Sequence, residues 1–145
     1  MKKSEGSRGL IQFVKFAVVG VSNTAVDWIV YYILINTLLT ETLEKSIAKA
    51  ISFVVAVINS YIWNTIWTFK KEYQKSVGKN GEIGTKSAIF FKFFIVSLIG
   101  WGVNYVVFRA TIGKFSSRDI VALIFASGAA TLWNFFANKL WTYRK

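Results

Sequence analysis

The stretch from Ala88 to Ile112 reads AIFFKFFIVSLIGWGVNYVVFRATI, and its only charged side chains are Lys92 and Arg109. An α-helix needs about 20 apolar residues to cross the ~30 Å hydrocarbon core of a bilayer. Three other stretches are equally long and apolar. We therefore expect an all-α membrane protein with four transmembrane helices, over Ile11 to Leu34, Ile47 to Phe69, Ala88 to Ile112 and Ile120 to Trp141.

The composition supports the same class. Hydrophobic residues make up 54% of the 145 residues, which is high for a soluble domain of this size. The sequence contains no Pro, Cys or His, which removes thiolate nucleophiles, imidazole bases and the usual zinc and iron ligands. We expect no metal, no cofactor and no enzymatic activity.

The net charge of +11 raises the question of nucleic acid, but the basic residues lie between long apolar runs rather than on a polar face. Lys and Arg near helix ends are retained on the cytoplasmic side. The four expected spans place 13 of the 18 basic residues on the side shared by both termini and the middle connection. The other five are Lys45, Lys49, Arg109, Lys114 and Arg118. We expect cytoplasmic termini and no nucleic-acid partner.

The connections predict two helical hairpins. Residues 36–46 and 113–119 are short and join the first helix to the second and the third to the fourth. The middle connection, Lys70 to Lys86, is polar and contains five lysines, so we expect a soluble loop.

The two hairpins resemble each other in sequence. Residues 64–70, NTIWTFK, match residues 138–144, NKLWTYR, at an offset of 74, which also aligns Ser60 with Asn134. Residues 13–16, FVKF, match residues 90–93, FFKF, at an offset of 77, which aligns Asn23 with Gly100 and Asp27 with Asn104. We interpret the single membrane domain, 1–145, as two parallel tandem repeats, 11–70 and 88–145, joined by a cytoplasmic loop, 71–87.

Helical spacing places small and polar residues on one face of the first two helices. Gly20, Asn23, Asp27 and Tyr31 share a face of the first helix, and Ser60, Asn64 and Trp67 share a face of the second. Lipid offers polar groups no hydrogen-bond partner, so we expect these faces to look inward.

These residues resemble the GtrA-like family of small membrane proteins. The resemblance rests on residues 13–24, FVKFAVVGVSNT, on Asp27, and on the Asn-x-x-Trp-Thr-aromatic motifs that begin at Asn64 and Asn138. It extends from Ile11 to the C-terminus. Ser60 departs from the family pattern, which usually has an asparagine there.

The resemblance implies a role in making cell-surface polysaccharides. Such proteins are associated with moving a polyprenyl-phosphate-linked monosaccharide from the cytoplasmic to the outer leaflet of the bacterial cell membrane, where a separate glycosyltransferase uses it. Members in Gram-positive bacteria are associated with teichoic acid glycosylation. We expect membrane lipids, the lipid-linked sugar and a membrane glycosyltransferase as partners, and the small size of the chain favours a homo-oligomer.

Several polar side chains are candidates for binding this substrate. A carboxylate within a transmembrane helix costs ~2.5 to 3.5 kcal/mol on insertion scales, so Asp27 is expected to be required for function and dispensable for folding. Lysines suit a lipid phosphate, amides suit sugar hydroxyls and phosphate oxygens, and tryptophans suit stacking. The candidates are Asp27, Asn23, Asn64, Asn134, Asn138, Lys15, Lys92, Lys139, Arg109, Trp67 and Trp141.

The same residues also fit purely structural roles. Asp27 would then neutralise Arg109, the lysines would set topology, and the asparagines would join helices. Two further functions fit the same pattern. One is a scaffold that recruits a glycosyltransferase without transport, and the other is a small proton-coupled multidrug exporter, although such exporters are normally shorter and lack this duplication.

Overall fold

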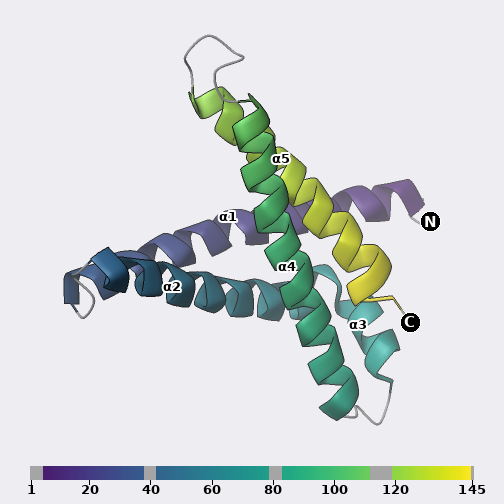
Figure 1. The fold of residues 1–145 in the computed structure, drawn as a ribbon. Coiled ribbons are helices and arrows are strands. Elements are labelled where there is room, and N and C mark those ends of the chain that lie inside the picture. The colour runs from purple at the N-terminus through teal and green to yellow at the C-terminus, as the bar shows by residue number, and fades with distance from the viewer. Residues whose placement is uncertain (1–4, 38–41, 79–82, 112–118, 145) are drawn as a thin grey trace. The chain divides into compact units, whose positions relative to one another are not determined.

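A computed structural model describes residues 5–37, 42–78, 83–111 and 119–144, which are almost entirely helical and contain no strand. The elements in chain order are α1 (Glu5–Thr37), α2 (Thr42–Trp63), η1 (Asn64–Thr68), α3 (Lys70–Val77), α4 (Ile83–Thr111), α5 (Asp119–Ala137) and η2 (Asn138–Thr142) (Figure 1). Here η marks a turn of π-helix.

Four helical segments are long and apolar enough to cross a membrane, which confirms the expected fold class. They cover Gly6–Thr37, Lys45–Thr68, Ile83–Thr111 and Ile120–Thr142, so η1 and η2 extend the spans that begin with α2 and α5. The chain is a multi-pass membrane protein.

The helices begin earlier than hydrophobicity alone predicts. α1 starts at Glu5 instead of Ile11, α2 at Thr42 instead of Ile47, and α4 at Ile83 instead of Ala88. The first connection is correspondingly shorter than residues 36–46. A helix does not end where the hydrocarbon ends: polar residues continue it in water, and no proline interrupts it.

The chain divides into two compact units, Met1–Lys70 and Lys71–Lys145. In unit 1, α1 packs against α2 and η1. Its buried side chains include Phe16, Val19, Ala56 and Phe69. The rings of Phe16 and Phe69 meet edge to face, with centroids 6.0 Å apart, and fix the end of η1 against α1.

Unit 2 is built in the same way from α4, α5 and η2. Phe93 of α4 meets Tyr143 edge to face, with ring centroids 6.4 Å apart, at the positions that match Phe16 and Phe69. Both Phe69 and Tyr143 are buried.

The middle connection contains a helix where we expected a loop. α3 places Tyr73 against the ring of Tyr143, with centroids 6.5 Å apart, and the Ser76 hydroxyl donates a 2.9 Å hydrogen bond to the Tyr143 carbonyl. The apolar residues Tyr73 and Val77 lie one helical turn apart, which gives the short helix a packing face. α3 thus belongs to unit 2, and Gly78, at φ 69°, ends it in a left-handed conformation.

Some sequence expectations fall on residues that the structure does not describe. These are residues 38–41 of the first connection, residues 79–82 of the middle one, and residues 112–118 between the third and fourth helices. Six of the basic residues that set the expected topology also lie outside the described residues: Lys2, Lys3, Lys79, Lys114, Arg118 and Lys145.

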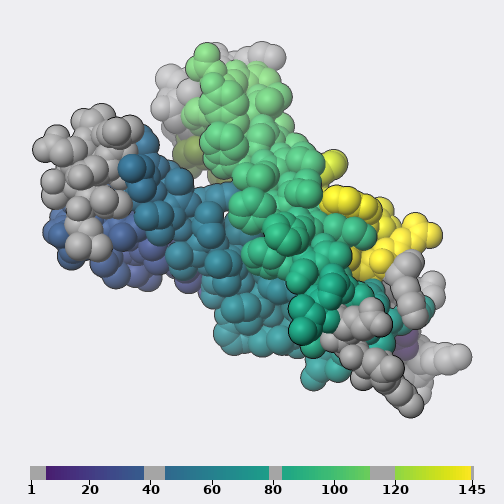
Figure 2. All heavy atoms as spheres, turned by 60° about the horizontal axis from the view of Figure 1, so that its bottom comes forward, coloured from purple at the N-terminus to yellow at the C-terminus, as the bar shows by residue number. Residues whose placement is uncertain are grey.

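Large apolar side chains cover the outside of both units. α2 presents Ile58 and Ile62 outward, and α4 presents Leu98, Trp101 and Tyr105. In the space-filling view, side chains along the length of α2, in blue, and of α4, in green, lie on the surface (Figure 2). Such surfaces are stable against lipid rather than water.

Candidate functional site

Each unit carries a π-helical turn at the motif Asn-x-x-Trp-Thr-aromatic. The backbone N–H of Phe69 donates to the carbonyl of Asn64 at 2.7 Å, and that of Tyr143 donates to the carbonyl of Asn138 at 3.0 Å. These bonds join residues five apart, instead of the four of an α-helix. Single π-turns within α-helices frequently occur at functional sites.

Each π-turn begins at an asparagine whose side chain bonds to the preceding helical turn. Asn64 Nδ2 donates to the Ser60 carbonyl at 2.9 Å, and Asn138 Nδ2 donates to the Asn134 carbonyl at 2.8 Å. In an α-helix that carbonyl accepts from the backbone N–H four residues later, so the side chain competes with the backbone for the same acceptor. In both asparagines the side-chain nitrogen is taken up by this carbonyl, and the side-chain oxygen points away from it.

The wider turn corrects one expected face. We expected Trp67 to look inward with Ser60 and Asn64, but Asn64 is 1% exposed and Trp67 is 41% exposed. The residues of η1 that are buried alongside Asn64 are Thr65 and Thr68. Unit 2 repeats this arrangement, with Asn138 and Thr142 buried and Trp141 exposed. Because the π-turn holds more residues per turn, the buried position moves from the third residue after the asparagine to the fourth.

Four polar atoms of these turns are buried and unsatisfied. Asn64 Oδ1, Thr68 Oγ1, Asn138 Oδ1 and Thr142 Oγ1 have no hydrogen-bond partner among the described residues. Four helical threonines elsewhere in the chain donate to the carbonyl four residues earlier: Thr24, at 3.1 Å, and Thr37, Thr111 and Thr131, each at 2.7 Å. An unpaired buried polar group costs about 1 to 3 kcal/mol, so both units carry this cost at the same two positions of the motif.

A lysine covers each motif tryptophan. Lys15 Nζ lies 5.2 Å from the ring centroid of Trp67, and Lys92 Nζ lies 5.5 Å from that of Trp141. These cation–π contacts join the two repeated motifs of each unit, which lie in different helices. Lys139, by contrast, lies over Phe135 within its own helical segment, at 5.4 Å from the ring centroid.

Asp27 belongs to a polar cluster of unit 1 that unit 2 does not repeat. Its carboxylate pairs with the ammonium of Lys49 and accepts a 2.7 Å hydrogen bond from the Ser52 hydroxyl. Lys49 Nζ also lies 5.8 Å from the ring centroid of Tyr31. At the positions that match Asp27, Lys49 and Ser52, unit 2 has Asn104, Leu123 and Ala126. Neither charge is therefore present there.

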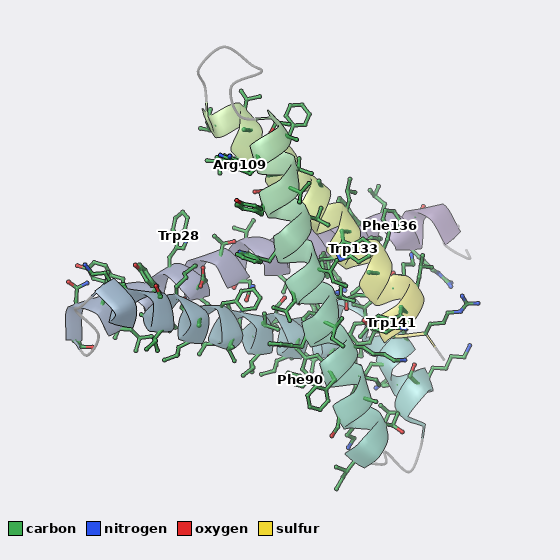
Figure 3. The ribbon with its side chains drawn as sticks, in the orientation of Figure 1. Trp28, Phe90, Arg109, Trp133, Phe136 and Trp141 are labelled. Carbon is green, nitrogen blue, oxygen red and sulfur yellow. The ribbon has the colours of Figure 1, made fainter. Side chains whose placement is uncertain are left out.

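The partner of Asp27 is Lys49, which we counted from sequence only as a topology signal. Arg109, the partner considered from sequence, is an exposed residue near the end of α4 (Figure 3). The side chain of Asp27 is 18% exposed and that of Lys49 is 54% exposed, so the pair is partly shielded.

The chain matches the family described as GtrA/DPMS, transmembrane domain, over residues 15–143. It belongs to the GtrA/DPMS transmembrane-domain family. No curated protein sequence matches the chain. The match includes both π-turns, both lysine–tryptophan contacts and the Asp27 cluster. Proteins of the GtrA family are generally non-catalytic membrane proteins, and the GtrA/DPMS domain indicates a role in handling polyprenyl-linked sugars for glycosylation.

The packing of unit 2 bears on the departure of this GtrA/DPMS chain from the family pattern at Ser60. In unit 2, Gly100 packs directly against Asn134: a Cβ added to Gly100 would lie 2.8 Å from Asn134 Cγ. The matched residues in unit 1 are Asn23 and Ser60, so the large and the small residue have changed places. The Oδ1 atoms of Asn23 and Asn134 are both buried without a partner among the described residues.

The expected face of α1 is wrong at Gly20. This residue is exposed, and a Cβ there would meet nothing within 4 Å, so it makes no close helix contact within unit 1. The glycine that makes a close contact with a neighbouring helix is Gly100 in α4, which packs against Asn134. Sequence reasoning also missed Lys49, Ser52, Thr68 and Thr142. The two threonines had a signal, because they recur within the same motif at the offset of 74.

Proposed function

We propose that this protein moves a polyprenyl-phosphate-linked monosaccharide across the bacterial cytoplasmic membrane, for cell-surface polysaccharide or teichoic acid glycosylation. The observation that supports this most is the set of buried, unsatisfied atoms of Asn64, Thr68, Asn138 and Thr142. A sugar carries many hydroxyl groups, each able to donate and accept a hydrogen bond. Amide oxygens and threonine hydroxyls inside a membrane span replace the water that such hydroxyls lose in hydrocarbon.

The other candidate residues fit the remaining parts of the substrate. Lys15 and Lys92 supply the positive charge for the phosphate, and Trp67 and Trp141 stack on the sugar or on the polyprenyl chain. Asn23 and Asn134 add two more unsatisfied amide oxygens, and Lys139 and Arg109 add further cations.

Translocation makes and breaks no covalent bond, so we propose that the protein is not an enzyme and needs no cofactor or metal. No group of metal-binding side chains occurs in the described part of the chain.

The two alternative functions fit the site less well. A proton-coupled exporter needs a carboxylate available to a cationic substrate, whereas Asp27 is engaged by Lys49 and Ser52. A scaffold needs only packing surfaces, and unsatisfied buried atoms in both units then lower stability without serving a purpose. We therefore favour translocation, with a membrane glycosyltransferase as the partner that receives the lipid-linked sugar, and with assembly of the small chain into a homo-oligomer.

Replacing the motif asparagines tests this proposal. Asn64→Leu and Asn138→Leu should each lower the surface glycosylation that depends on this protein by about tenfold, because each removes a hydrogen bond of ~1.4 kcal/mol or more to the sugar. Glycan release and quantification from cells measures this. Asn36→Leu is the matched control: Asn36 also bonds the carbonyl four residues earlier, at 2.7 Å, but is exposed. Equal glycosylation in all three variants, at equal protein levels, would reject the sugar-binding role.

We also propose that both termini and α3 lie on the cytoplasmic side. The sequence has no cysteine, so single cysteines report position without background. Ser76→Cys should resist an impermeant thiol reagent in intact cells and react after permeabilisation, whereas Asn36→Cys should react in intact cells. The reversed pattern would show that the orientation is wrong.

A further inference from the structure

Each unit has an apolar groove between its two long helices, next to the motif tryptophan. The groove of unit 1, about 400 Å³, is lined by Val18, Val19, Ser22, Trp63, Ile66 and Trp67. The groove of unit 2, about 540 Å³, has walls from α4, α5 and η2, including Val96, Trp133, Phe136 and Trp141. Figure 3 shows these three aromatic residues following one another along α5 and η2.

The two grooves are equivalent. All six residues that line the first have matched residues that line the second: Ile95, Val96, Ile99, Ala137, Leu140 and Trp141. Val19 and Val96 are buried, while the tryptophans are partly exposed. In unit 2 the indole of Trp133 donates a 3.2 Å hydrogen bond to the Val96 carbonyl and extends the wall.

A cation stands at the same end of both grooves. Lys15, Val18, Val19 and Ser22 follow the spacing i, i+3, i+4, i+7 along one face of α1, and Lys92, Ile95, Val96 and Ile99 repeat it on α4. Each lysine lies over the tryptophan that lines its groove. Among the described residues of its own unit, neither Lys15 nor Lys92 forms an ion pair with a carboxylate, unlike Lys49.

We propose that each groove binds one polyprenyl phosphate, so that a single chain holds two of these lipids at once. The phosphate pairs with Lys15 or Lys92, and the first isoprenoid units lie in the groove against Trp67 or Trp141. A cation beside an apolar groove complements an anionic head joined to an apolar tail. The choice of isoprenoid rests on the proposed function.

Native mass spectrometry of the full chain with undecaprenyl phosphate tests the stoichiometry. The wild type should bind two molecules per chain, Lys15→Gln and Lys92→Gln one each, and the double variant none. Lys75→Gln, which removes an exposed charge in α3, should still bind two. One molecule per wild-type chain, or two in the double variant, would overturn the proposal.

Filling the grooves provides a second test that leaves the charges in place. Val18 and Ile95 are 51% and 44% exposed, so Val18→Trp and Ile95→Trp should not disturb the folded core. Each should weaken undecaprenyl phosphate binding in its own unit at least tenfold. Equal binding after both substitutions, or displacement by an equal concentration of phosphatidylglycerol, would show that the grooves are not isoprenoid sites. Because these measurements detect binding alone, two bound lipids without transport would reject the proposed function and leave this proposal standing.

Discussion

Lys49→Leu should lower the free energy of unfolding of unit 1 by about 2 kcal/mol. The substitution leaves the carboxylate of Asp27, 18% exposed, without its counter-ion in an apolar helix pair. Breaking a buried pair costs about 3 to 5 kcal/mol, and partial exposure of Lys49 reduces this. Thermal unfolding of the purified protein in detergent, monitored by circular dichroism, measures the change.

The double variant Asp27→Asn/Lys49→Leu provides the control. It reproduces the Asn104 and Leu123 of unit 2, an uncharged arrangement that this fold already contains. We expect it to recover most of the lost stability. If the double variant is less stable than Lys49→Leu alone, the pair does not stabilise unit 1 through its charges.

Asp27→Asn by itself separates folding from function at this cluster. Lys49, 54% exposed, can extend its ammonium toward the interface, and Ser52 can still donate to the amide oxygen. The protein should therefore accumulate normally while the surface glycosylation that depends on it falls. Loss of the protein itself would return Asp27 to a structural role.

Gly100→Ala should destabilise unit 2 by about 1 to 3 kcal/mol, the usual cost of overpacking. The new Cβ would collide with the side chain of Asn134 at its Cγ, 2.8 Å away, so the whole amide group must move. Thermal unfolding again measures the effect. Gly102→Ala is the matched control in the same helix, because its Cβ would meet nothing within 4 Å.

Adding Asn134→Ser should rescue Gly100→Ala, because unit 1 has Ser60 at the matched position. The swap Gly100→Asn/Asn134→Ser, which installs the unit 1 pair, should also fold. If Asn134→Ser does not restore the stability of Gly100→Ala, then the small residue in one helix of each unit does not make room for the larger residue in the other.

The helices were predictable from sequence because crossing a bilayer imposes a length and a hydrophobicity that each segment shows by itself. The contacts across each hairpin were less predictable. Lys15 and Trp67 were marked by the repeat, but their contact depends on how α1 packs on η1. The π-turns were not predicted, and one extra residue per turn was enough to exchange Trp67 for Thr68 at the buried position.

The Asp27–Lys49 pair shows another limit of sequence reasoning. Both residues were noted, but Lys49 follows the hairpin connection and was counted as a charge near a helix end. Its distance from Asp27 is fixed by where α1 ends and α2 begins, at Thr37 and Thr42, and helix ends are poorly set by hydrophobicity. The internal repeat does not indicate the pair either, because unit 2 has the uncharged Leu123 at the position that matches Lys49.

Transport in proteoliposomes tests the central proposal most directly. Purified protein would be reconstituted with an undecaprenyl-phosphate-linked monosaccharide, and the sugar reaching the opposite leaflet would be followed with a membrane-impermeant oxidant. We expect the wild type to equilibrate the two leaflets faster than protein-free vesicles, and the Asn64→Leu/Asn138→Leu variant to lose most of this acceleration. Equal rates with and without the wild-type protein, in vesicles where the protein is folded and binds the lipid, would contradict translocation and favour the scaffold.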